Sequence, residues 1–252
     1  MALVSFVFGL IVGSFLNALI YRLGSCSRSI FDKDSVCPKC QHVLAWSDLI
    51  PVVSFFLLGG KCRYCRKKIS RQYPLVELAT GTIFLLIAQN FQFSIFNFQF
   101  LAQLVFACFL IVIFVYDLKH YLILDKVVLP AAILAAAYQL IAGQLLNGFY
   151  GALILSGFFW ILYLLSRGRA IGFGDVKLGV FLGLLVPFPQ TIALFFLSYM
   201  SGAVVSIILM AIGVKSLKDR LPFGTFLTFA AFVAMLWGEE FISWYFYQIG
   251  IR

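Results

Sequence analysis

The run ALVSFVFGLIVGSFLNALI, residues 2–20, decides the fold class of this chain. It contains no charged residue, and as a helix rising about 1.5 Å per residue it nearly crosses a hydrocarbon core of about 30 Å. Similar runs recur along the 252 residues, which are 63% hydrophobic and only 12% charged. That is about half the charged share of soluble domains. The sequence therefore predicts an all-α polytopic integral membrane protein whose main surroundings are the lipid bilayer.

The apolar runs predict eight transmembrane helices. They are expected near residues 2–20, 74–90, 99–116, 127–143, 149–166, 176–189, 191–213 and 222–238. The first basic residue, Arg22, follows the first run, whereas a cleavable signal peptide begins with basic residues. We therefore expect an uncleaved first span.

The lysines and arginines orient these spans. With Arg22 inside, nearly all of them fall in inner loops, and the outer connections carry no charge. The inner loops are residues 21–73, 117–126, 167–175 and 215–221. This is the positive-inside pattern of membrane proteins. Topology thus explains the net charge of +9, and no nucleic-acid partner is expected.

The first inner loop contains two CxxC pairs, CPKC and CRYC. Four thiolates at such spacing can close a tetrahedral Zn²⁺ site, here a structural one, with Cys37, Cys40, Cys62 and Cys65 as ligands. Disulfides and a redox role are the alternatives, but a cytoplasmic loop lies in a reducing compartment. The apolar run 49–58 between the pairs is too short to span and is expected at the membrane interface. The predicted domains are a first span (1–20), a cytoplasmic Cys-rich domain (21–73) and a membrane domain (74–252).

Three of the ten acidic residues lie at the cytoplasmic ends of spans. Asp117 closes the third span, where the negative end of the helix dipole disfavours a carboxylate. Asp125 and Asp175 each precede a span, where an N-cap role competes with a functional one. Gly172 and Gly174, which flank Asp175 in GFGDVKLG, permit close backbone approach and unusual dihedrals.

Asp117 and Asp175 can form a working pair, because helix packing can join two spans at the cytoplasmic boundary. Asp125 is eight residues from Asp117, about 12 Å along a helix, which is too far to share a proton. Two carboxyl groups that share a proton can activate water for peptide hydrolysis. Glu77 lies about one turn inside the second span, where an ionisable group is a functional candidate or the partner of a basic residue.

An ordered set of motifs resembles the bacterial type IV prepilin peptidases, membrane aspartyl proteases of the GxGD type. The motifs are GLIVGSFLNALIYRL, the cysteine loop with LAWSDLIPVVSFFLLGGKCRYC, YPLVELATG, DLKHYLILD and GFGDVKLG. The resemblance implies that Asp117 and Asp175 are the catalytic dyad. Residues expected to support the site are Asp125, Gly172, Gly174, Lys177 and Glu77. One position departs from the family, since Leu124 stands where proline commonly precedes the second loop aspartate, and this loosens the turn before Asp125.

The resemblance also implies substrates and a second activity. The substrates would be prepilins and pseudopilins with a short basic leader ending in glycine, cleaved on the cytoplasmic side of the bacterial inner membrane. Many members then methylate the new amine with S-adenosylmethionine, an activity associated with the cysteine domain, although no motif here reveals the donor's contacts. Two other classes compete with this interpretation: an ion-coupled transporter using membrane carboxylates and a zinc-stabilised assembly scaffold.

Overall fold

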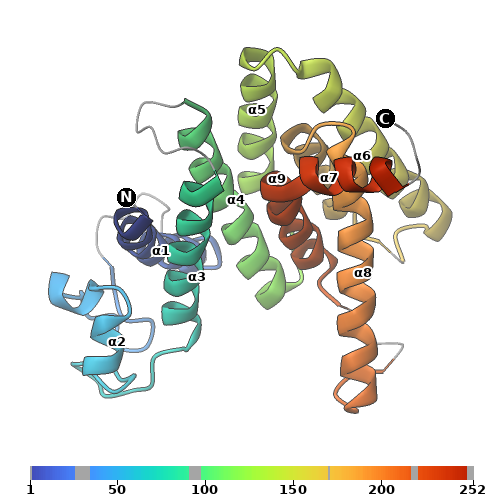
Figure 1. Cartoon of the computed structure of the whole chain (residues 1–252). Helices are drawn as coiled ribbons and strands as arrows, with labels where there is room; N and C mark the ends of the chain where they lie inside the picture. The colour runs from blue at the N-terminus through green and yellow to red at the C-terminus, as the bar shows by residue number, and fades with distance from the viewer. Residues whose placement is uncertain (1, 26–34, 91–97, 170, 217–220, 249–252) are drawn as a thin grey trace. The chain divides into compact units, whose positions relative to one another are not determined.

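The computed structural model describes residues 2–25, 35–90, 98–169, 171–216 and 221–248 (Figure 1). These residues are mostly helical, and their only strand-like pairings are two isolated β-bridges. The elements are α1 (Ala2–Leu23), the short 3₁₀ helix η1 (Trp46–Leu49), α2 (Val53–Leu57), α3 (Gln72–Asn90), α4 (Phe98–His120), α5 (Asp125–Ile141), α6 (Leu145–Ser166), α7 (Phe173–Leu185), α8 (Gln190–Ala211) and α9 (Phe223–Gln248). The predicted all-α class is confirmed.

Five described helices are long and apolar enough to cross a membrane: α1, α4, α6, α8 and α9. The chain is therefore a multi-pass membrane protein, but the predicted number of eight spans is not confirmed. The other three predicted spans coincide with α3, α5 and α7, which are shorter or less apolar. α7 has only 13 residues, about 20 Å, and the chain leaves the helix before Pro187.

The segment between the cysteine pairs forms no span. Its only α-helix, α2, has five residues, and the Phe56 and Leu57 side chains are 70% and 81% exposed. Trp46 in η1 is equally open. A segment with this exposure is compatible with the expected interfacial position, which stays a prediction.

The chain divides into two compact units, Met1–Cys108 and Phe109–Arg252, and the division falls within α4. In the first unit α1 packs against α3 (Figure 1). A Cβ on Gly9 would lie 2.8 Å from the Cα of Gly81, and one on Gly13 would lie 2.8 Å from the Cα of Glu77. Small residues one turn apart thus bring the two helix backbones together, as is common between membrane helices.

In the second unit α7 is the central element, packed against α6, α5 and α9, while α8 packs mainly on α9. A side chain at Gly183 would overlap the backbone of Ala152, so α6 and α7 touch through their main chains. The Gln139 side chain donates a 2.8 Å hydrogen bond to the carbonyl of Leu184 and holds α5 to the end of α7. The core between these helices has no exposed surface at Leu155, Phe159, Leu178, Phe181 and Leu182. This packing fixes the first turn of α7, which carries Asp175.

Candidate functional site

Asp117 lies in the last turn of α4 and is almost fully buried, with 4% of its surface exposed. Its Oδ2 accepts a hydrogen bond of 3.0 Å from the backbone N–H of Thr225. Thr225 stands in the first turn of α9, where backbone N–H groups have no partner within the helix. The positive end of one helix therefore compensates the unfavourable position of this carboxylate at the negative end of another.

Asp175 is the third residue of α7 and is half-buried. Its Oδ2 accepts the N–H of Gly172 at 3.2 Å, while its own N–H donates to the Gly172 carbonyl at 3.1 Å. Gly172 is thus the N-cap residue, and Asp175 caps the helix from inside its first turn. Asp175 stands ahead of the expected span at residues 176–189. Burial first, and then the charge of Asp117, raises its pKa to about 6. The Asp117 carboxylate is thus one of the charges that act on Asp175.

Ile123, in the connection after α4, lies close to the first turn of α7 and to the first turn of α9. A Cβ on Gly174 would lie 3.0 Å from the Cβ of Ile123. A Cβ on Gly224 would lie 3.2 Å from the Ile123 Cδ1 and 2.8 Å from the Oδ2 of Asp117. Both glycines leave room for the same isoleucine, and Gly224 also leaves room for the carboxylate. The expected close backbone approach at Gly174 is therefore observed.

The expected unusual dihedrals of the motif glycines are not observed. Gly172 has φ −77° and ψ 152°, an extended conformation open to other residues, and Gly174 lies inside α7. Neither glycine has a positive φ.

Asp125 does not join the two buried aspartates through any described hydrogen bond. It is the first residue of α5, whose N-cap is Leu124, and it makes no cap with its side chain. Its Oδ2 instead pairs with the Nζ of Lys177 at 2.7 Å. The lysine also lies 4.9 Å from the centroid of the Phe173 ring. This partly exposed pair joins the beginnings of α5 and α7.

The four cysteines of the CxxC pairs form one cluster in the first unit. Their sulfur atoms all lie within 4.8 Å of one another, and the Sγ atoms of Cys37 and Cys65 are 4.0 Å apart. Tetrahedral Zn²⁺ with Zn–S bonds of about 2.3 Å places its sulfurs about 3.8 Å apart. The residues present therefore fit a metal ion, and they are Cys37, Cys40, Cys62 and Cys65.

The two halves of this cluster repeat the same backbone pattern. The N–H of Cys37 donates to the carbonyl of His42 at 3.0 Å, and the N–H of Cys62 donates to that of Lys67 at 2.9 Å. The residues four positions after these cysteines, Gln41 and Arg66, both have positive φ and donate back to the cysteine carbonyls. Each CxxC pair is thus preformed as a tight turn. Two matched turns that present four thiols to one point are typical of a structural metal site.

Glu77 is buried in α3, with 7% of its surface exposed, and it connects the Cys-rich loop to the helices of its own unit. Its Oε2 accepts the N–H of Val52 at 2.7 Å. Val52 has φ 63°, an uncommon conformation for a β-branched residue. The described bonds thus give Glu77 a backbone partner, whereas the sequence left a basic partner or a functional role open.

Sequence reasoning did not identify three residues beside Asp117: Ile123, Gly224 and Thr225. The segment LPFGT, residues 221–225, carries a signal that was available, because proline is favoured at the start of a helix and a helix N-terminus attracts anions. Its pairing with Asp117 depends on a contact across 108 residues, which no local pattern reveals.

Two family descriptions cover most of the chain. Residues 7–91 match the bacterial peptidase A24 N-terminal domain, and residues 104–207 match the type IV leader peptidase family. No solved structure matches the chain.

Curated relatives from several bacteria are similar over almost the whole length. A protein of Pseudomonas aeruginosa is 30% identical, covering 99% of this chain and 95% of the relative, and one of Stutzerimonas stutzeri is 31% identical, covering 96% and 93%. A protein of Bacillus subtilis is 30% identical over 95% of this chain and 96% of its own length. All three are named prepilin leader peptidase/N-methyltransferase.

Proposed function

The chain belongs to the type IV leader peptidase family, and on that premise we propose that Asp117 and Asp175 are the water-activating pair of a membrane aspartyl endopeptidase. The observation that supports this role most directly is the buried Asp117 carboxylate, fixed by the Thr225 N–H and acting electrostatically on Asp175. Asp117 lies at the unfavourable end of its own helix and is accommodated there by the N-terminus of α9.

The proposed chemistry needs one proton on the pair. Repulsion between two nearby carboxylates splits their titration, so that one stays protonated while the other is ionised. The ionised group takes a proton from water, which attacks the scissile carbonyl carbon, while the protonated group donates a hydrogen bond to the carbonyl oxygen. The C–N bond then breaks, and the leaving amine receives a proton. Gly174 and Gly224, which both leave room for Ile123, would position the two carboxylates.

The proposed substrates are prepilins and pseudopilins with a short basic leader that ends in glycine and precedes an apolar helix. The relatives' names support a prepilin substrate. The positive-inside distribution of basic residues supports a cytoplasmic position, at the bacterial inner membrane, for both aspartates and the Cys-rich loop. Cleavage would then follow the glycine on that side.

A second activity, N-methylation of the new amino terminus, is proposed from the same names. S-adenosylmethionine would supply the methyl group, and we assign no residue of this chain to its binding. Zn²⁺ bound by the four cysteines would supply a structural crosslink for the Cys-rich loop. The same loop contains Val52, whose N–H donates to Glu77 of α3. Because the resemblance associates methylation with the cysteine domain, we propose the Cys-rich domain, residues 21–73, for methyl transfer.

Purified protein tests the peptidase with a prepilin-like precursor, comparing wild type with Asp117→Asn and Asp175→Asn. Each substitution is expected to abolish cleavage, whereas Glu240→Gln, at an exposed carboxylate of α9, retains it. Mass spectrometry of a pre-cleaved peptide measures methylation in the same samples, which we expect both aspartate variants to keep. Cleavage at the wild-type rate by either variant would show that the pair is not catalytic.

A further inference from the structure

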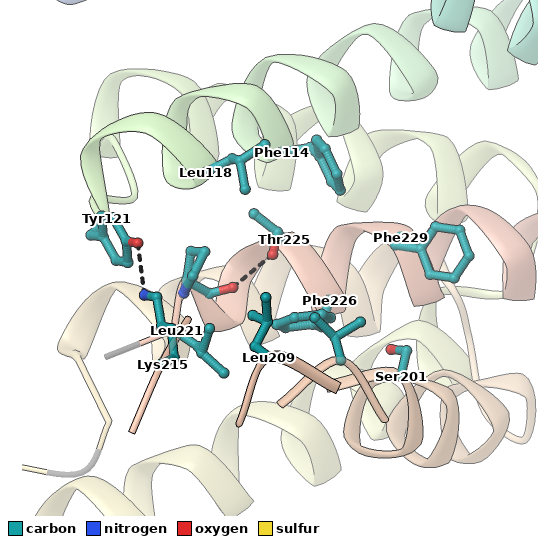
Figure 2. Close-up of a pocket in the computed structure, with 12 residues that line it drawn as sticks. Phe114, Leu118, Tyr121, Ser201, Leu209, Lys215, Leu221, Thr225, Phe226 and Phe229 are labelled. Carbon is teal, nitrogen blue, oxygen red and sulfur yellow. Dashed lines mark hydrogen bonds between the residues drawn. The ribbon is translucent and has the colours of Figure 1, made fainter. Parts of the chain in front are cut away.

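An elongated cavity of about 450 Å³ lies in the second unit between α4, α8 and α9 (Figure 2). Its size is within the range of about 300–1,000 Å³ that binding pockets show. Its walls are mostly apolar. Figure 2 shows Phe114, Leu118, Phe226 and Phe229 around it, and Lys215 beside Tyr121 at one end. The Nζ of this lysine donates a hydrogen bond of 3.2 Å to the Tyr121 hydroxyl.

The register of its lining residues shows that the cavity is a groove parallel to the helices. α8 contributes Ser201, Val205 and Leu209, each four residues from the next, so a single face of that helix forms one wall. Eight residues of helix rise about 12 Å, or a little more than two turns. The groove therefore has the length of a short stretch of apolar chain.

The groove passes beside Asp117, one member of the candidate catalytic pair. Thr225 lines it and also donates its backbone N–H to Asp117. Leu118, another lining residue, directly follows Asp117 in α4. From this level the wall continues through Phe114 toward the interior of the expected third span. A chain bound here would pass from the level of Asp117 toward the apolar part of the membrane.

We propose that this groove, between α4, α8 and α9, binds the apolar segment that follows the scissile bond of the precursor. The proposal rests on the proposed peptidase function, which it extends with a substrate-binding surface. The groove has the apolar lining, the direction and the starting point that such a segment requires. The basic leader is a poorer occupant, because the charged lining residue, Lys215, would repel it.

A groove-filling substitution, Val205→Phe, tests the proposal in the full-length protein. Its matched control is Val204→Phe on the same helix, because Val204 is 50% exposed and does not line the groove. Each variant is assayed on two substrates: a precursor with its complete apolar segment, and a short peptide that ends four residues after the scissile bond.

Val205→Phe is expected to raise KM for the complete precursor roughly tenfold or more, the size of effect that apolar pockets give. The kcat/KM for the short peptide should stay within about threefold of wild type, and Val204→Phe should leave both substrates within the same limit. An equal loss on both substrates, or no loss on the precursor, would overturn the proposal. Such a result leaves the aspartate dependence of cleavage intact, whereas cleavage by Asp117→Asn at the wild-type rate overturns the assignment of the catalytic pair.

A photo-crosslinking amino acid provides a second measurement that does not depend on the activity of Val205→Phe. p-Benzoylphenylalanine at position 205, in the Asp117→Asn background, should attach to the apolar segment of the precursor, and at position 204 it should not. A lipid adduct at 205 that excess precursor does not displace would assign the groove to lipid and overturn the proposal.

Discussion

Gly224→Ala should slow peptide cleavage while leaving the protein folded. The added Cβ would lie 2.8 Å from the Oδ2 of Asp117, whereas ordinary van der Waals contact begins at 3.4 Å, so one partner must move by about 0.6 Å. The Cβ would also lie 3.2 Å from the Ile123 Cδ1, and the carboxylate oxygen, as the end of a flexible side chain, is the closest atom. The carboxylate is therefore the group that shifts, and its bond to the Thr225 N–H lengthens.

The size of the effect follows from this displacement. A misplacement of about 1 Å at a reacting group can lower a rate about a hundredfold, so about 0.6 Å predicts a loss of roughly tenfold in kcat. That corresponds to about 1.4 kcal/mol in the activation free energy. The backbone itself should not suffer, because alanine in a helix is favoured over glycine by about 1 kcal/mol.

The assay is the initial rate of precursor cleavage at saturating substrate, together with thermal unfolding of each purified variant. Gly202→Ala on α8 is the matched control, since its new Cβ would meet its nearest neighbour at an ordinary 3.6 Å. It should cleave at the wild-type rate. A well-folded Gly224→Ala enzyme with wild-type kcat would refute the argument that this glycine positions Asp117.

Three further substitutions test other parts of the fold. Cys62→Ser should lower the zinc content measured by elemental analysis well below one ion per chain, because the cluster loses a thiolate; unchanged zinc would contradict the four-cysteine site. Gly183→Ala should destabilise the protein by about 1–3 kcal/mol, because the new Cβ would overlap the backbone of a neighbouring helix. Gly157→Ala is the control, since its new Cβ has no neighbour within 4 Å, and equal melting temperatures of the two variants would contradict the backbone contact. Lys177→Met should change the free energy of unfolding by less than about 1 kcal/mol, because the ion pair of Lys177 with Asp125 is partly exposed. A larger loss of stability would mean that the pair is more than a surface contact.

The positions of the helices could be predicted from the sequence because lipid imposes a simple rule on apolar runs. Each of the eight predicted spans coincides with a helix, yet apolarity does not fix where a helix stops. The predicted span at 176–189 includes Pro187 and Pro189, and the helix ends at Leu185. Residues before proline are disfavoured in the α conformation, so backbone sterics override the apolar pattern there.

The cysteine cluster could be predicted because its information is local. CxxC spacing fixes each turn, and only the approach of two similar turns remains to be supplied by the fold. The Glu77 contact is different. The sequence indicates a buried carboxylate in a span, but its acceptor role toward Val52 depends on a loop 25 residues away. A carboxylate that accepts a backbone N–H needs no basic partner, which is why charge counting alone could not resolve this residue.

The glycines of GFGDVKLG have structural roles that the residue type alone does not reveal. Gly172 uses its N–H, which any residue except proline could supply, and its backbone is in an ordinary extended conformation. Gly174 is required to be small by Ile123, 51 positions earlier in the chain. The side chain of the same isoleucine also lies close to Gly224. Two glycines in separate helices therefore both leave room for Ile123. The proposed consequence is the spacing of the Asp117 and Asp175 carboxylates. Enlarging either glycine should accordingly impair cleavage through the position of a carboxylate, whereas a Cβ at Gly172 would meet the Asp175 Oδ2 at an ordinary 3.5 Å.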